Sequence, residues 1–338
     1  MGKIVAAPWL AVVALLSFAP APTFGDDAPA LAQPIACDVG RTCFIQHYVD
    51  LDPGPGARDF TCGPQTYEGH NGIDIRLTGM AAQRAGVSVL AAAPGVVAGV
   101  RDSMADVSVR VAGLASVKDV ECGNGALIDH GGGWSTQYCH MAHGSLAVKA
   151  GDHVTTGQVL GRVGLSGETE FPHLHFTVRH NGQPIEPFAY GEPAGACSGG
   201  RSLITARPGS DLGYHYPEVI NAGFASRAVT MDEIESGVAE ASALAPGPRS
   251  TALAAYVRVI GLKAGDQPSL RLVAPDGAVL ADNPSPALSQ WQAQSFLLTG
   301  KRLTAGSWPA GAYRARFTVR HGGAVLLTRD FTLMMAAG

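Results

Sequence analysis

Two stretches of the chain alternate apolar and polar residues over short distances, with glycine turns between them, and this pattern limits the possible folds most. In residues 313–319, Tyr, Ala, Phe and Val occupy every second position and Arg or Thr the positions between. A period of two predicts a strand with one buried face. The 43 glycines and 22 prolines favour short strands and turns over long helices. We therefore expect a mainly β protein.

Changes in this pattern divide the chain into parts. We expect a signal peptide (1–25), an N-terminal segment (26–64), a domain of short alternating strands between glycine turns (65–190), a linker region (191–249) and a C-terminal β-sandwich of immunoglobulin-like type (250–338). Within the linker, a short helix should begin at Thr230, because Glu233 three residues later completes a capping box. In the sandwich, Pro275-Asp276-Gly277 and His321-Gly322-Gly323 should turn between strands.

The first residues predict export. Lys3 precedes an apolar run at residues 4–18, small residues follow at 19–21, and Asp26 begins a polar stretch. The run is too short to span a bilayer comfortably, although an uncleaved anchor is the alternative. No later segment could span a membrane, so we expect a mature chain in the periplasm of a two-membrane bacterium or secreted.

Charge and composition argue against other classes. The formal net charge is -4 and the pI about 6.2, whereas nucleic-acid ligands usually carry a basic footprint, so we expect no nucleic-acid partner. Hydrophobic residues make up 46% of the chain and charged residues only 15%. That balance supplies enough apolar side chains for ordinary cores and excludes a largely disordered chain.

Six cysteines, an even number, suggest disulfides in an exported protein. We expect Cys122 to pair with Cys139, because a turn at residues 130–133 would bring their strands side by side. Cys37–Cys43 is the natural local pair, and Cys62–Cys197 would then tie the two ends of the first domain together. Sequence alone permits other connectivities.

Neither a thiolate metal site nor a catalytic cysteine is favoured. The chain has no Cys-x-x-Cys pair, which argues against a thiolate zinc site. Cys139 stands next to His140, but adjacent residues of a strand point to opposite faces. We therefore expect the two side chains not to meet.

Histidines and one aspartate form three elements within residues 65–190. His70 and Asp74 are four apart, with Gly72 between them and a strand after it. His173 and His175 are two apart in a segment of strand character, so both should project from one face. Imidazole and carboxylate are both zinc ligands, so these residues are candidates for a metal site.

A third element, residues 135–140, places His140 at the end of a strand that follows the turn at residues 130–133. A single histidine at such a place is more often structural than catalytic. Each of the three elements is a weak signal by itself, so the argument depends on their occurring together.

Together these elements resemble the lysostaphin-type, or LytM-like, zinc metallopeptidases over residues 65–190. His70 and Asp74 match the family's His-x-x-x-Asp motif, His173 and His175 its His-x-His motif, and His140 the histidine of its Tyr-x-His strand. Further matching segments surround them in the same order: Ile128-Asp129-His130-Gly131, Val148-Lys149-Ala150-Gly151-Asp152, Gly157-Gln158-Val159-Leu160-Gly161 and Gly164-Leu165-Ser166-Gly167.

The resemblance implies an antiparallel β fold with an open groove and cleavage of peptide bonds in peptidoglycan. It implies that His70, Asp74 and His175 hold one Zn²⁺ ion, while His140 and His173 lie near the water or the substrate carbonyl. Some relatives have lost their zinc ligands and activate cell-wall amidases, and a non-catalytic activator is therefore the alternative function. A second alternative is a wall-binding protein in which the C-terminal sandwich is the working part.

Three features depart from the family pattern or lie outside it. Residues 102–121 look like an insertion that could form a rim loop, and Met141 replaces the usual leucine. His47 precedes the matched region, where a pro-segment could give zinc a fourth ligand and silence the enzyme. The alternative for His47 is a solvated loop histidine.

Overall fold

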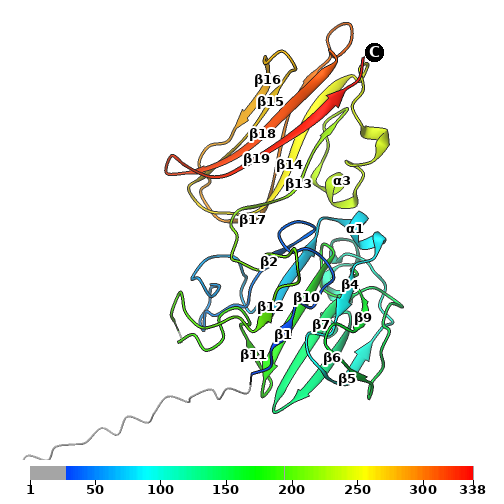
Figure 1. Cartoon of the computed structure of the whole chain (residues 1–338), viewed down its shortest axis with the longest axis vertical. Coiled ribbons are helices and arrows are strands. Elements are labelled where there is room, and N and C mark those ends of the chain that lie inside the picture. Colours follow the sequence, from blue (N-terminus) through cyan, green and yellow to red (C-terminus); the bar gives the residue numbers. More distant parts are fainter. Residues whose placement is uncertain (1–27, 194, 338) are drawn as a thin grey trace, which may run out of the picture.

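A computed structural model describes residues 28–193 and 195–337, so the expected signal peptide lies outside the described residues. It forms two units, one above the other in Figure 1. We call the part before residue 218 the first unit and residues 218–337 the second unit. Over the described ranges, none of the helices has the length and apolar character needed to cross a membrane.

The first unit is built on an eight-stranded antiparallel sheet. Its strands run in the order β2 (Cys43–His47), β3 (Ile73–Leu77), β10 (His173–His180), β7 (Trp134–Met141), β6 (Asn124–Gly131), β5 (Gly95–Arg101) and β8 (His153–Val154), with β11 (Gln183–Ile185) also paired to β10. The strand of the His-x-His motif, β10, thus lies between the strand of Asp74 and the strand that ends near His140. The predicted mainly β, antiparallel fold is confirmed.

Smaller elements cover this sheet. They are the antiparallel pair β4 (Ser88–Leu90) and β9 (Val159–Arg162), the parallel pair β1 (Leu31–Ala32) and β12 (Ile204–Thr205), and the helices α1 (Met80–Ala85), α2 (Val109–Ala112) and η1 (Leu114–Ser116). Two of these strands and β2 lie outside residues 65–190. The sheet therefore draws on the N-terminal segment 26–64, which was expected to precede the domain, because β2 is buried along its whole length beside β3.

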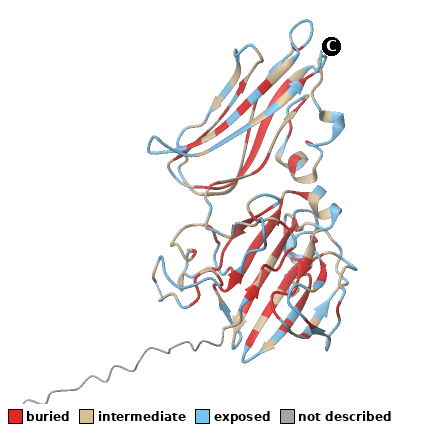
Figure 2. Cartoon of the chain, viewed as in Figure 1, coloured by how far each residue is buried: buried red, intermediate tan, exposed pale blue. Residues whose placement is uncertain are grey.

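The second unit has two sheets around one apolar core. A three-stranded sheet contains β13 (Glu218–Ala225), β14 (Ala252–Leu262) and β17 (Gln292–Arg302); a four-stranded sheet contains β16 (Val279–Pro284), β15 (Asp266–Val273), β18 (Gly311–His321) and β19 (Ala324–Met335). Buried side chains from both sheets form one cluster, and Figure 2 shows them alternating with exposed positions. The immunoglobulin-like topology remains a prediction.

The second unit begins earlier than the sequence suggested. β13 pairs with β14 from Glu218 to Ala225, inside the segment 191–249 that was expected to be a linker. The same segment contains α3 (Met231–Ser236) and η2 (Ser242–Leu244). Thr230 caps α3 and forms the expected capping box with Glu233, so this part of the prediction is confirmed.

Three disulfides close the first unit: Cys37–Cys43, Cys62–Cys197 and Cys122–Cys139. These are the pairs expected from the sequence. Cys62–Cys197 joins residues 135 apart in the sequence. Cys62 precedes β3 and Cys197 follows β10, the strands that carry Asp74 and His175.

Buried polar contacts join the two units where α1 faces α3 (Figure 1). Oε2 of Glu235, in α3, accepts hydrogen bonds from Arg76 of β3 and from Arg258 of β14. Arg258 also donates to the Thr78 carbonyl at 2.5 Å, and Arg76 to Oε1 of Gln294 at 2.7 Å. Both arginines are fully buried, so the junction is a fixed contact and not a solvated tether.

Candidate active site

Strand register brings the three candidate ligands together. Asp74 of β3 lies directly opposite His175 of β10, and His70 precedes β3 by one turn of loop. One ligand atom from each of His70, Asp74 and His175 lies within 4.8 Å of the others. Gly72 permits this approach, because a Cβ there would lie 2.7 Å from Nε2 of His175.

Outer hydrogen bonds fix which ring nitrogen of each histidine faces the cluster. Nδ1–H of His70 donates to the Tyr48 carbonyl at 2.6 Å, which turns Nε2 toward Asp74. Nε2 of His175 lies 3.1 Å from both Oδ1 of Asn71 and Oγ1 of Thr177, so Nδ1 faces Oδ1 of Asp74 at 2.9 Å. Such outer partners orient metal-binding imidazoles in proteins.

The electrostatics of the cluster favour an ionised aspartate among its ligands. Burial by itself raises the pKa of Asp74, but the neighbouring histidines, chiefly His70 and His173, outweigh burial and hold it well below its ordinary value. Burial lowers the pKa of His175, which favours its neutral form. Burial also acts to lower the pKa of His70, but Asp74 outweighs it and the pKa is raised. A carboxylate and neutral imidazoles are the forms that bind a divalent metal.

His140 reaches the same space by way of a β-bulge. Cys139 and His140 together face one residue of β6, since the pairing shifts from Asn124–Met141 to Ala126–Tyr138. His140 has φ 59°, in the left-handed region. The expectation that Cys139 and His140 would point to opposite faces is therefore wrong, because the bulge interrupts the strand's alternation and both residues line the groove.

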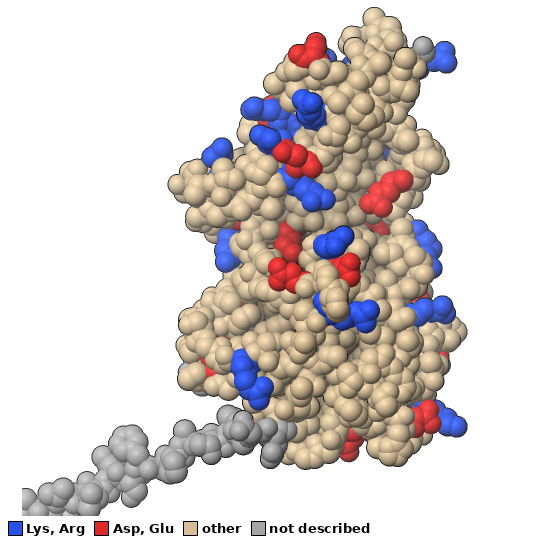
Figure 3. Space-filling model, viewed as in Figure 1, with Lys and Arg blue, Asp and Glu red and all other residues tan. Residues whose placement is uncertain are grey.

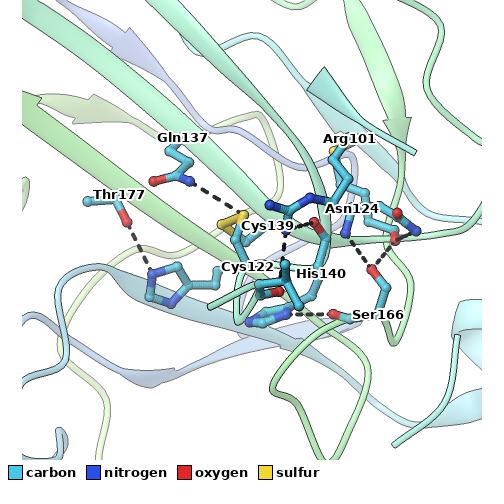
Figure 4. The surroundings of a disulfide bond; sticks show 12 residues. Arg101, Cys122, Asn124, Gln137, Cys139, His140, Ser166 and Thr177 are labelled. Atoms are coloured by element: carbon cyan, nitrogen blue, oxygen red, sulfur yellow. Dashed lines mark hydrogen bonds between the residues drawn. A yellow bond between two sulfur atoms is a disulfide. The ribbon is translucent and has the colours of Figure 1, made fainter. Parts of the chain in front are cut away.

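Cys139 is nevertheless no nucleophile, because its sulfur is bonded to Cys122 and the described chain has no free cysteine. Figure 4 shows this disulfide beside His140, with Gln137 on the same strand, β7, and Thr177 on the neighbouring strand, β10. The disulfide thus forms part of the groove surface.

His140 and His173 are held in a similar way. Nδ1–H of His140 donates to the Ser166 carbonyl at 2.8 Å (Figure 4), and Nδ1 of His173 lies 2.9 Å from the Phe171 carbonyl. Each ring therefore turns Nε2 inward, and that of His173 lies 3.4 Å from Oδ1 of Asp74. Burial, then His173 and His175, lower the pKa of His140 well below its ordinary value. A neutral imidazole with a free lone pair can accept a proton.

His47 is not the solvated loop histidine that the sequence offered as one alternative, and its role as a fourth zinc ligand remains a prediction. It lies buried in β2, and its Nδ1 is 3.0 Å from Oδ2 of Asp74. It therefore fixes the outer oxygen of the candidate ligand, while Oδ1 faces His70 and His175. Sequence reasoning missed this contact because β2 pairs with β3 across 27 residues, and only the extended character of residues 43–47 hinted at a strand.

The groove runs along these side chains and has a volume of about 380 Å³. Its walls include Tyr67, Glu168 and Arg179, none of which was singled out from the sequence. Glu121, the last residue of the 102–121 insertion, also lines the groove. Part of the insertion therefore lies at the rim, where a loop was expected.

The model of peptidase family M23 matches residues 68–187, a range that contains all five candidate residues: His70, Asp74, His140, His173 and His175. Residues 68–187 form a domain of peptidase family M23. The family predicted from the motifs is thus confirmed. The remainder of the chain, including the second unit, lies outside this match.

Known proteins are similar to parts of this M23 domain. The DD-carboxypeptidase/endopeptidase Mpg of Neisseria meningitidis serogroup B is 39% identical over 71 residues, which cover 21% of this chain and 16% of that protein. Peptidoglycan DD-endopeptidase ShyA of Vibrio cholerae is 36% identical over 63 residues, 19% of this chain and 14% of that protein. The chain thus spans less than a fifth of the length of these relatives.

Among solved structures, the catalytic domain of the prophage-encoded M23 protein EnpA from Enterococcus faecalis is 26% identical. The match covers 51% of this chain and 98% of that chain, with a TM-score of 0.29.

Proposed function

We propose that the protein is a zinc-dependent endopeptidase that hydrolyses peptide bonds in the cross-links or stem peptides of peptidoglycan. The observation that carries this proposal is the convergence of His70, Asp74 and His175 next to two further inward-facing histidines. The names of the M23 relatives, a DD-carboxypeptidase/endopeptidase and a DD-endopeptidase, support the substrate class.

The residues present fit a zinc ion. Two imidazole nitrogens and one carboxylate oxygen are a ligand set that Zn²⁺ takes in catalytic sites. One ligand atom of each residue lies within 4.8 Å of the others. A zinc ion held there would act as a Lewis acid, lowering the pKa of water and polarising a carbonyl.

We assign acid–base roles to His140 and His173. His140 is neutral and turns Nε2 into the groove, so it can take a proton from the attacking water and return one to the leaving amine. His173 lies beside Asp74 and can hold the substrate carbonyl or share the proton transfer. Neither role requires a serine or cysteine nucleophile.

Export to the periplasm or beyond follows from the same proposal, because peptidoglycan lies outside the cytoplasm. Three disulfides suit an oxidising compartment. Figure 3 shows both acidic and basic residues on the visible face, with several basic residues gathered on the upper, second unit.

Digestion of purified peptidoglycan tests the proposal. The zinc-loaded full chain should release peptides cut at one type of bond, identified by mass spectrometry of the muropeptides, and chelation should stop the release. A matched control is the His175→Ala variant. If the wild type released nothing but accelerated a purified cell-wall amidase, the activator function would replace this one.

A further inference from the structure

Arg179 is a charged groove residue to which the proposed chemistry assigns no task. It lies on β10, four residues after His175 and two after Thr177, and therefore on the same face of the strand. It lines the groove together with His140 and His175. Within the described ranges, no carboxylate lies close enough to form an ion pair with it. A half-buried guanidinium without an anionic partner is a candidate for binding an anion.

The guanidinium leans toward the ligand cluster. Arg179 lies opposite Ser135 in the β10–β7 ladder, yet its Nη1 donates to Oε1 of Gln137 at 2.7 Å. Gln137 lies opposite Thr177 in this ladder, between the level of Arg179 and the level at which His175 lies opposite Cys139. The guanidinium thus lies at the level of Thr177, the next residue after His175 on the same face of β10. Same-face residues of a strand are roughly 7 Å apart, so the guanidinium lies about that far along the strand from His175.

The amide nitrogen of Gln137 is a second donor in the same groove, which Cys122 also lines. Its Oε1 is taken by Arg179, and its Nε2 lies 3.5 Å from Sγ of Cys122 (Figure 4). A disulfide sulfur is a weak acceptor, so this amide N–H can donate to a better one. The fork of Arg179 and the amide of Gln137 together match the two oxygens of a carboxylate.

We propose that Arg179 and Gln137 form a carboxylate subsite for the substrate residue whose nitrogen belongs to the scissile amide. This inference rests on the proposed endopeptidase function. One residue advances a peptide by about 3.5 Å, so a carboxylate on that residue comes within reach of an arginine side chain when the carbonyl lies at the ligand cluster.

The subsite selects a substrate class by chemistry. It favours an amide whose nitrogen stands on a carbon that also bears a free carboxylate. A cross-link to a diamino dicarboxylic acid has this carboxylate, and so does a C-terminal amino acid. A glycine bridge cut internally, or a cross-link to the side-chain amine of lysine, has no carboxylate there.

Two matched peptides test the subsite. Both carry a D-alanyl amide to the same diamino dicarboxylic acid, and they differ only in whether the adjacent carboxylate is free or converted to the carboxamide. We expect the zinc-loaded full chain to cleave the free acid at least ~10-fold faster in kcat/KM, the range expected for a charged hydrogen-bonded pair. Arg179→Gln should lose this preference by slowing cleavage of the acid alone. Arg162→Gln, an exposed arginine of β9 outside the groove, is the control and should keep it.

Binding separates this proposal from the proposed function. Ketomethylene analogues of both peptides cannot be cleaved, and their affinities can be measured by calorimetry with the same proteins. Arg179-dependent preference for the acid analogue without any cleavage would retain the subsite and overturn the endopeptidase. Cleavage of acid and amide at equal rates, or an equal loss of both in Arg179→Gln, would overturn the subsite and retain the endopeptidase.

Discussion

The two units differ in what they bury. The first unit groups ionisable side chains at its centre, including His70, Asp74, His140 and His173, whereas the second unit has one large apolar cluster with Arg258 and Asp266 as its buried charged residues. Burying a polar group is costly unless it is fully hydrogen-bonded. The first unit meets this cost through outer partners such as the Tyr48 and Ser166 carbonyls. The contrast places the concentrated polar cluster, the candidate for chemistry, in the first unit.

The largest effect should come from removing a ligand. His175→Ala leaves His70 and Asp74 without their partner across the β10–β3 ladder. We expect the variant to lose stoichiometric zinc by elemental analysis and hydrolysis to fall below detection. The second unit should be unaffected, because its core shares no residue with the cluster. Full zinc occupancy in this variant would show that the ligand assignment is wrong.

Next in size is the loss of the acid–base candidates. His140→Ala and His173→Ala should each lower turnover by ~100-fold or more, the typical worth of a positioned acid or base. Zinc content and melting temperature should stay near those of the wild type. Their double variant should lose little beyond the worse single variant, because groups on one proton path act as a unit. Loss of zinc in either single variant, with activity restored by added metal, would make that histidine a ligand instead.

A substitution at the junction of the two units should lower stability without touching the candidate active site. Arg258→Met removes one of two arginines from Glu235 and leaves the Thr78 carbonyl without its donor. Breaking such a buried contact should cost about 3 kcal/mol of unfolding free energy, measured in urea at saturating zinc. Arg316→Gln is the matched control, because its partner Asp330 is exposed, and it should unfold like the wild type. Equal stability of both variants would contradict a fixed junction.

The smallest effect is a pH dependence. Burial raises the pKa of Glu186, behind the ligand loop, to about 8. Because the folded-state pKa is above the unfolded value, this group stabilises the fold at low pH, and that stability is lost as pH rises from about 4.5 to about 8. The melting temperature of the wild type should fall more steeply across this window than that of Glu186→Gln. Parallel curves would show that Glu186 does not titrate there.

Features set by neighbouring residues could be predicted from the sequence, whereas pairings between strands far apart in the sequence could not. The shared face of His173 and His175 follows from a period of two, and the cap at Thr230 from its neighbour Glu233. The contact of His47 with Asp74 depends on a register between strands that no local pattern specifies.

Two further features needed the structure for the same reason. The bulge at His140 depends on a shift against β6, and the position of Arg179 depends on its contact with Gln137 across the ladder. The start of the second unit at Glu218 was hidden because β13 finds its partner 29 or more residues later, beyond α3 and η2.

The Cys62–Cys197 bond makes the chain between these residues a closed covalent ring. All five candidate residues, His70, Asp74, His140, His173 and His175, lie on that ring. A protease that cut one exposed loop, such as residues 102–121, would open the ring without releasing a fragment. The ligand strands would remain tethered and could re-pair at high effective concentration. The chain would thus tolerate a single nick in this loop, and would lose that tolerance when the disulfide is reduced.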